Sequence, residues 1–382
     1  MTMSIRLSLN HVSKEFQLVL DIINDQIIPN KFANIDWMLF TDLIEHHRLF
    51  SFIYPKLREK EELVPENILR SLESMYQQNT IRMLHLSGEM SIISSLFTKK
   101  NIPLIVLKGP VLAQDLYGDI SLRTSSDLDV LVPIKQLECA EEILSKRGYI
   151  KNDYIKTVLN DWRWRHHHVT YVHPQKKVKV ELHWRLNPGP AKEPSFSELW
   201  NRKRVSTITK EPIYILGKED LFFFLSTHGA RHAWSRLRWL LDIRQLLERD
   251  LDWNFIYTLF MKNHYIPVGS QAIILSSSIF DTPLPNIDKL LLNKQGEKLA
   301  QLVVFYFERM VNLHTVPVPD EVSSYHSKYL FSSFSWQQKC LYLLSLLYPF
   351  PEDAETLPLP QKYHFLYFLL RPYLWARRRM FT

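Results

Sequence analysis

The spacing of apolar residues changes twice along this chain. From Val12 to Lys99 they recur every three or four positions, which predicts a helical N-terminal region. Residues 102–107, IPLIVL, form a continuous branched run of strand length, and further strand-like runs follow before helical spacing returns at Lys218. We therefore predict an α/β (α+β) centre between two helical regions. The expected division of the chain is 1–99, 100–217 and 218–382.

Glycine and cysteine usage exclude several classes of protein. The chain has 9 glycines, and none of them forms a G-x-G-x-x-G or G-x-x-x-x-G-K motif, which excludes Rossmann dehydrogenases and Walker-type ATPases. The two cysteines, Cys139 and Cys340, lie far apart without any C-x-x-C. A cysteine-based zinc site and a disulfide framework are therefore excluded, and a reducing compartment is the natural assignment.

Charge and hydropathy bear on location and partners. No secretory apolar segment follows the first charge and no long apolar stretch occurs, so we expect a cytoplasmic protein with no transmembrane segment. The formal net charge is +7, and residues 156–185 hold seven Lys/Arg against two acids. This basic zone would attract a polyanion such as a nucleoside triphosphate or RNA, or it is an ordinary solvated face.

Residues 102–184 contain the signals for a sheet. After the first strand come Lys108-Gly109 and then Pro110, a residue suited to the first position of a helix. DLDVLV at 127–132 predicts a second strand, and two runs flanking HPQKK predict a β-hairpin. The two-residue period of a strand places Lys179, Glu181 and His183 on one face.

Three acids in these strands are the candidate catalytic and metal-binding residues. Asp127 and Asp129 project to one face of their strand, where their repulsion is costly unless a divalent cation such as Mg²⁺ lies between them. A frayed strand end with Asp127 as a cap is the plainer alternative. Glu181, in the hairpin, can converge on the pair to hold two metals for phosphoryl or nucleotidyl transfer, or it makes a surface salt bridge with Lys179 or Arg185.

These residues carry a family resemblance. The sequence resembles nucleotidyltransferases of the DNA polymerase β superfamily, specifically the bacterial uncharacterised nucleotidyltransferase family. The motifs are LKGPVLAQDLYGD (107–119), LRTSSDLDVLV (122–132), VKVELHW (178–184) and HGARHAWSRLRWLLDIRQLL (228–247). The resemblance implies a minimal nucleotidyltransferase core with a mixed sheet, flanked by helical regions.

The resemblance also implies roles for the acids. Asp127 and Asp129 match the metal ligands of the superfamily, and Glu181 matches the third carboxylate, which holds the second metal and aids deprotonation of the nucleophile. The implied cofactor is Mg²⁺, as two ions, with Mn²⁺ as a substitute. The implied substrate is a nucleoside triphosphate such as ATP. The resemblance leaves the acceptor undefined, so a small molecule, a peptide or protein, and RNA all stay open.

Phosphate binding is expected near the first turn. Lys108 and Gly109 stand where the superfamily usually has Gly-Ser, and the amides that open the Pro110 helix present the positive end of its dipole. Lys108 adds a full charge. Arg123 is either a bidentate phosphate ligand or the partner of Asp119 in a salt bridge.

Histidines supply the remaining candidates. Because consecutive side chains in a strand alternate between faces, His166, His167 and His168 are not expected to bind one ion together. We expect His168 near the nucleotide and its histidine neighbours in solvent. On a continuous helix starting near Glu219, the spacing of His228, His232 and Arg236 would place them on one stripe. This stripe is polar packing between domains or, as the resemblance implies, contacts the nucleotide or acceptor.

The sequence thus predicts a Mg²⁺-dependent nucleotidyltransferase that releases pyrophosphate. The alternative is a non-catalytic nucleotide-binding or scaffold protein on the same fold, because a fold does not by itself establish a reaction.

Overall fold

The computed structural model describes residues 7–9, 12–153, 155–206, 208–283, 292–313, 315 and 317–380. Residues 1–6, 10 and 11 of the N-terminal segment, on which the expected absence of a secretory signal depends, lie outside the described residues. The helical N-terminal region is confirmed, and its helices are α1 (Lys14–Ile23), α2 (Trp37–His46), α3 (Phe50–Arg58) and α4 (Glu66–Lys99). Among the described residues, no helix is both long and apolar enough to cross a membrane.

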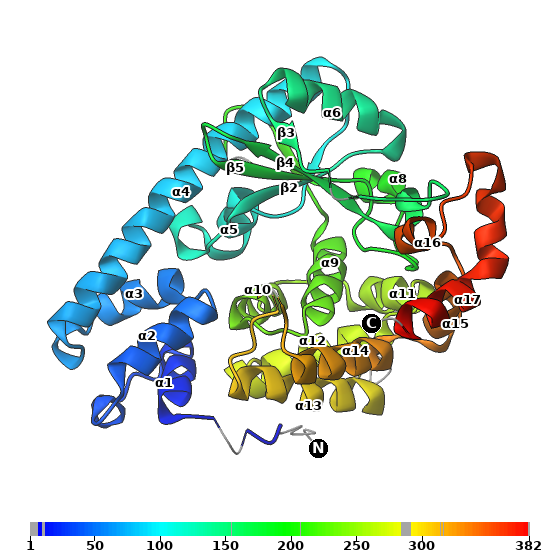
Figure 1. Ribbon diagram of the computed structural model, residues 1–382. Coiled ribbons are helices and arrows are strands. Elements are labelled where there is room, and N and C mark those ends of the chain that lie inside the picture. The colour runs from blue at the N-terminus through cyan, green and yellow to red at the C-terminus, as the bar shows by residue number, and fades with distance from the viewer. Residues whose placement is uncertain are drawn as a thin grey trace.

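The mixed sheet is confirmed and lies in the upper part of the molecule as drawn in Figure 1. Its seven strands run in the order β3-β4-β5-β2-β1-β7-β6. Their bounds are β1 (Ile105–Val106), β2 (Asp127–Leu131), β3 (Ile150–Lys151), β4 (His168–His173), β5 (Val178–His183), β6 (Arg204–Ser206) and β7 (Ile213–Ile215). The predicted hairpin is β4 and β5, which pair antiparallel. The short strands β3, β6 and β7 were not predicted, because two or three residues carry too little pattern.

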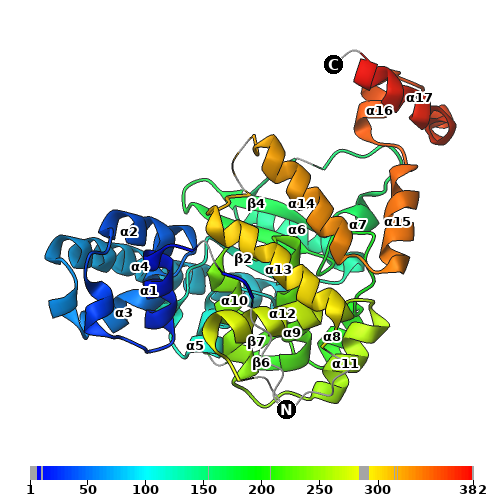
Figure 2. The same cartoon turned by 90° about the horizontal axis from the view of Figure 1, so that it is seen from below.

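Helices connect the strands and build the C-terminal region, which was correctly predicted to be helical. The connecting helices are α5 (Pro110–Tyr117), α6 (Leu137–Lys146), α7 (Trp162–Arg165) and α8 (Phe196–Asn201). The C-terminal helices are α9 (Lys218–Arg231), α10 (Leu237–Leu247), α11 (Trp253–Lys262), α12 (Ile266–Phe280), α13 (Lys294–Glu308), α14 (Asp320–Ser333), α15 (Trp336–Leu346), α16 (Pro351–Thr356) and α17 (Tyr367–Met380). Figure 2 shows α1–α3 at one end of the molecule and α15–α17 at the opposite end.

Two hydrophobic clusters cover the sheet. One joins the second half of α4, including Met90 and Phe97, to α6 and to Leu128 and Val130 of β2. The other is larger and runs from the N-terminal helices past Leu131 to α9–α13. The helical regions therefore share a core with the sheet, and burial of this apolar surface fixes the elements that meet at the site.

The predicted helix through His228, His232 and Arg236 is interrupted, which corrects the expectation of a single stripe. α9 ends at Arg231, and α10 begins at Leu237. Between them Ala233 and Trp234 have positive φ angles of 49° and 52°. The fully buried Trp234 indole folds back on Gly229, where an added Cβ would lie 2.4 Å from the ring. Glycine thus permits the packing that reverses the chain at this point.

Candidate active site

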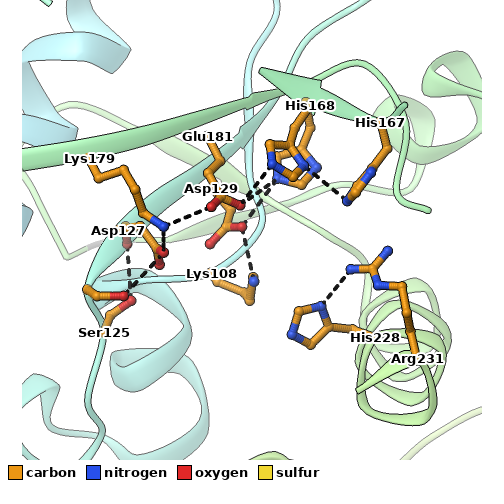
Figure 3. A network of polar contacts seen from close by, with 12 residues as sticks. Lys108, Ser125, Asp127, Asp129, His167, His168, Lys179, Glu181, His228 and Arg231 are labelled. Atoms are coloured by element: carbon orange, nitrogen blue, oxygen red, sulfur yellow. Dashed lines mark hydrogen bonds and ion pairs between the residues drawn. The ribbon is translucent and has the colours of Figure 1, made fainter. Parts of the chain in front are cut away.

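The three predicted carboxylates lie on two adjacent strands. Asp127 and Asp129 belong to β2, Glu181 belongs to β5, and the parallel register sets Asp129 directly beside Glu181. Asp129 is only 1% exposed, whereas Asp127 and Glu181 are half-buried. All three line one cavity of about 470 Å³ (Figure 3). The two-residue period and the strand pairing therefore bring the acids together as the sequence predicted.

Two lysines neutralise these acids. Lys179 Nζ lies 2.8 Å from Asp127 Oδ2 and 2.9 Å from Glu181 Oε1, and Lys108 Nζ lies 3.0 Å from Asp129 Oδ1. Burial alone would lower the pKa of Lys179, but the two carboxylates raise it. For Asp129 the effects are reversed: burial alone would raise its pKa, but the Lys108 charge and the His183 ring lower it. Asp129 is thus held ionised by the neighbouring Lys108 and His183.

Lys108 owes its position to the turn before α5. Gly109 is the N-cap of this helix and has a φ angle of 91°, a conformation that favours glycine. An added Cβ there would lie 3.3 Å from the Leu128 side chain. Pro110 occupies the first helical turn, as predicted. The turn therefore directs the Lys108 ammonium to Asp129, while Gly109 itself packs against β2.

Three histidines adjoin the acids. His183 Nε2 lies 3.2 Å from Asp129 Oδ1 and 3.7 Å from Glu181 Oε2. His168 Nε2 lies 3.8 Å from the same Glu181 oxygen, and His168 Nδ1 lies 3.1 Å from His167 Nε2. Burial, with the charge of His183, lowers the pKa of His168 to about 4. Burial would lower the pKa of His183 too, but hydrogen bonds to Asp129 and Glu181 raise it.

The expectation that the histidines beside His168 are solvated was wrong for His167. β4 begins only at His168, so His167 precedes the strand and does not alternate with it. Nitrogen atoms of His167, His168 and His183 lie within 4.8 Å of one another. Burial lowers the pKa of His167 well below its usual range, which keeps its ring neutral. We call Asp127, Asp129, Glu181 and these three histidines the carboxylate wall.

The opposite side of the cavity is strongly basic. His228, His232 and Arg236 line it despite the helix break, so both predicted histidines and the arginine reach the cavity. Arg48, Arg231 and Arg238, which the sequence analysis did not single out, line it as well. We call these six residues the basic wall. With the two lysines, the described lining residues hold six Lys/Arg against three acids, which suits an anionic ligand.

Arg231 is the most informative residue that sequence reasoning missed. It lies at the end of α9 and faces the carboxylates and Lys108 across the cavity (Figure 3). Its Nη2 donates to His228 Nδ1 at 3.1 Å, whereas its Nη1 is buried without a hydrogen-bond partner. A buried guanidinium with an unused donor is costly unless an anion binds there. Its place inside the 228–247 motif was the available signal.

Arg123 corrects another expectation. It neither lines the cavity nor pairs with Asp119, which instead caps the turn at Ser121. Its guanidinium is fully buried and donates to both oxygens of Asp242 on α10, each at 2.9 Å. Tyr117 of α5 donates to the same carboxylate at 2.8 Å. Arg123 is therefore a buried structural ion pair and not a phosphate ligand.

The basic zone at 156–185 is not a continuous free basic face. Five of its seven Lys/Arg residues pair with acids, one of them within the carboxylate wall. The pairs are Lys156 with Glu355, Arg165 with Asp161, Lys176 with Glu89, Lys179 with Asp127 and Glu181, and Arg185 with Glu193. The positive charge available to a ligand is concentrated in the cavity instead.

Comparison with known proteins identifies the family. The model of the uncharacterised nucleotidyltransferase family matches residues 33–261, which is more than half of the chain. The match includes every residue of both walls of the cavity. No curated protein and no solved structure shows a significant match. The chain therefore belongs to the uncharacterised nucleotidyltransferase family, and this membership supports a general role in nucleotidyl transfer.

Proposed function

We propose that this protein transfers a nucleoside monophosphate from a nucleoside triphosphate to an acceptor oxygen and releases pyrophosphate. The observation that carries the proposal is the meeting of Asp127, Asp129 and Glu181 in a cavity whose other wall is basic. A volume of about 470 Å³ lies within the ordinary range for sites that bind small molecules. Carboxylates opposite arginines suit a triphosphate, because one wall can hold cations and the other can bind phosphate oxygens directly.

The carboxylates fit a divalent cation such as Mg²⁺. Asp129 Oδ2 is buried without a hydrogen-bond partner, so this oxygen is available to a cation. Asp127, Asp129 and Glu181 would hold the metal. The ammonium groups of Lys108 and Lys179 would then move away from these carboxylates or share them with the metal. When bound, a divalent metal neutralises charge on the phosphates and polarises the attacking oxygen.

The remaining roles follow from charge and position. Arg231 and Arg236 would bind phosphate oxygens from the basic wall, and the pyrophosphate that leaves would be stabilised there. Lys108 lies between the two walls (Figure 3), where its positive charge can stabilise the negative charge that develops on the leaving group. Glu181, through the metal that it helps to hold, would aid deprotonation of the acceptor hydroxyl.

A small-molecule or peptide acceptor suits the site better than RNA. The basic zone that favoured RNA is largely paired with acids, and the cationic groups lie inside a cavity. Binding of an RNA acceptor would weaken steeply with salt, because many phosphate contacts release counterions. A small acceptor predicts little salt dependence.

The lysines also favour a second candidate function. Two carboxylates without cations would be costly, but Lys108 and Lys179 compensate them in the absence of any metal. The acids could therefore persist in a non-catalytic nucleotide-binding or scaffold protein. Such a protein would bind a nucleoside triphosphate without releasing pyrophosphate.

The test is a calorimetric and thermal-shift titration of the four nucleoside triphosphates, each with Mg²⁺ and with EDTA. We expect metal-dependent binding of at least one nucleotide to the wild-type protein and its loss in the Asp127→Asn/Asp129→Asn variant. Glu61→Gln/Glu62→Gln, which removes two adjacent exposed acids, is the matched control and should bind as wild type does. Retained binding in the Asp variant would contradict the site. Binding without pyrophosphate release, across a range of acceptors, would favour the scaffold function.

A further inference from the structure

The donor atoms around His183 are spaced like the ligands of one metal ion. Nε2 of His183 lies 3.2 Å from Asp129 Oδ1 and 3.7 Å from Glu181 Oε2. One donor atom from each of these three residues lies within 4.8 Å of the donor atoms of the other two. Ligands that bind a single ion at about 2.0–2.2 Å lie roughly 3–3.5 Å from one another. The cluster therefore needs little rearrangement to surround an ion.

The tautomer of His183 prepares its Nε2 for this role. Its Nδ1 lies 3.3 Å from the backbone carbonyl oxygen of Arg185, and a carbonyl can only accept, so Nδ1 carries the proton in this contact. The lone pair of Nε2 then points at two carboxylates. This arrangement is unfavourable unless a second proton or a metal ion lies between the nitrogen and the carboxylate oxygens. A ring N–H that donates to a backbone carbonyl is the usual arrangement behind a metal-binding histidine.

His168 adds a second imidazole from the neighbouring strand β4. Its Nε2 lies 3.8 Å from Glu181 Oε2, which is the oxygen that His183 also approaches. His168 and His183 are paired directly across the antiparallel ladder of β4 and β5, so the backbone holds both rings on the same side. The sheet thus places a second imidazole nitrogen beside Glu181, next to the group formed by Asp129, Glu181 and His183.

An independent observation comes from the carboxylate oxygens. Asp129, 1% exposed, keeps Oδ2 buried without a hydrogen-bond partner, although Oδ1 is bound by Lys108 and His183. Lys179 takes Oε1 of Glu181, and Oε2 faces the imidazoles. A buried carboxylate oxygen with no donor is costly. Each acid therefore has one oxygen held by a lysine, while the other has no partner in Asp129 and faces the imidazoles in Glu181, where a cation can bind.

We propose that Asp129, Glu181, His168 and His183 bind a divalent transition-metal ion of the zinc and cobalt type in preference to Mg²⁺. Imidazole nitrogen suits such ions, whereas Mg²⁺ favours oxygen ligands and retains its waters. Asp127, which pairs with Lys179 and stands outside this cluster, would hold the second ion, the one on the triphosphate, together with the shared Asp129. Ion binding stands on the geometry alone, and a role for this ion in the transfer rests on the proposed function.

The test uses Co²⁺ as a spectroscopic probe on the full-length protein, without nucleotide. We expect one Co²⁺ per chain with visible d–d absorption typical of nitrogen ligands, and retention of Co²⁺ in excess Mg²⁺. His168→Ala and His183→Asn should each weaken Co²⁺ binding at least tenfold, because each removes a ligand. His232→Asn, in the same cavity but on the basic wall, is the matched control and should bind Co²⁺ as wild type does.

The outcomes separate this inference from the proposed function. Co²⁺ that is displaced by equimolar Mg²⁺, or bound equally well by His168→Ala and wild type, would overturn the inference. Because His168 is more exposed than His183, His168→Ala decides the matter if His183→Asn does not fold. Binding of nucleoside triphosphate with Mg²⁺ is measured on the same preparations. Nucleotide binding without the Co²⁺ site leaves the proposed function intact, and a Co²⁺ site without nucleotide binding contradicts the function alone.

Discussion

The carboxylate wall and the basic wall of the cavity differ in how the chain builds them. The acids lie on β2 and β5, two adjacent strands whose parallel register fixes Asp129 beside Glu181. The basic wall instead gathers side chains from the end of α2, the end of α9 and the start of α10, and none of these segments is hydrogen-bonded to the sheet by a strand ladder. The first wall is set by backbone pairing, and the second is set by helix packing.

This difference predicts that the two walls have different roles in the reaction. A rigid sheet can hold charged groups in one arrangement, which suits ions and reacting atoms. Arginines at helix ends have long side chains and can adjust to the position of a phosphate tail. We therefore expect substitutions in the carboxylate wall to lower kcat and substitutions in the basic wall to raise KM. The predictions below test that difference in roles.

The largest effect is expected for Asp129→Asn. This residue is the most buried of the three acids and has the unpartnered oxygen. Its loss should reduce kcat for nucleotidyl transfer about a thousandfold or more, ~4 kcal/mol of transition-state stabilisation. Pyrophosphate release under saturating nucleotide gives the measurement, with Glu61→Gln as the exposed control. A wild-type kcat in Asp129→Asn would show that the carboxylate wall takes no part in the reaction.

A smaller effect, on stability, is expected where the two walls are joined. Arg123 precedes β2, Asp242 lies on α10, and their buried ion pair connects the sheet to the helix that carries part of the basic wall. Asp242→Asn leaves a buried guanidinium without its counter-charge, which should lower the free energy of unfolding by roughly 3 kcal/mol. Chemical denaturation measures this. The double variant Arg123→Met/Asp242→Leu should recover much of the loss, and equal destabilisation in both variants would contradict the pairing argument.

The sequence predicted much of the carboxylate wall because its signals are local. A two-residue period determines which side chains of β2 and β5 share a face, and the turn residues around 174–177 define the hairpin. The resemblance to a family then assigned the three acids. What the pattern does not contain is the lysine partners of those acids, since Lys108 and Lys179 reach them only once the strands are paired.

The basic wall was less predictable because it depends on tertiary contacts. The chain reverses at Ala233 and Trp234, and this break decides which arginines of the 228–247 motif face the cavity. Arg48 comes from another part of the sequence altogether. Arg123 was misassigned because its partner Asp242 is 119 positions away, and residue type alone does not distinguish a phosphate ligand from a buried ion pair.

Arg231→Gln tests the basic wall. The buried guanidinium with one unused donor should bind phosphate, so its loss is expected to raise KM for the nucleoside triphosphate about tenfold, with a smaller change in kcat. Steady-state kinetics with varied nucleotide measure both constants. Arg309→Gln, at an exposed ion pair after α13, is the control. A fall in kcat as large as that of Asp129→Asn, with KM unchanged, would mean that the two walls do not divide the work.

The smallest effect is expected from a histidine that supports the basic wall. His47 follows α2, is fully buried, and accepts a hydrogen bond at Nδ1 from the backbone N–H of Leu237, the first residue of α10. Burial, and secondarily the charges of His46 and Arg236, lower its pKa well below the usual 6.5. As the pH falls below 6.5, the unfolded chain binds a proton at His47 and the folded chain does not, so stability decreases.

This linkage contributes a slope of up to about 1.4 kcal/mol per pH unit between pH 6.5 and the lowered pKa. In His47→Asn the contribution is absent, and the unfolding free energy should fall less steeply with acid than in wild type. Denaturant titrations at several pH values compare the slopes, with His85→Asn on the exposed side of α4 as the control. Parallel slopes for wild type and His47→Asn would show that the contact between α2 and α10 does not hold this ring unprotonated, and the helix packing beneath the basic wall would need another explanation.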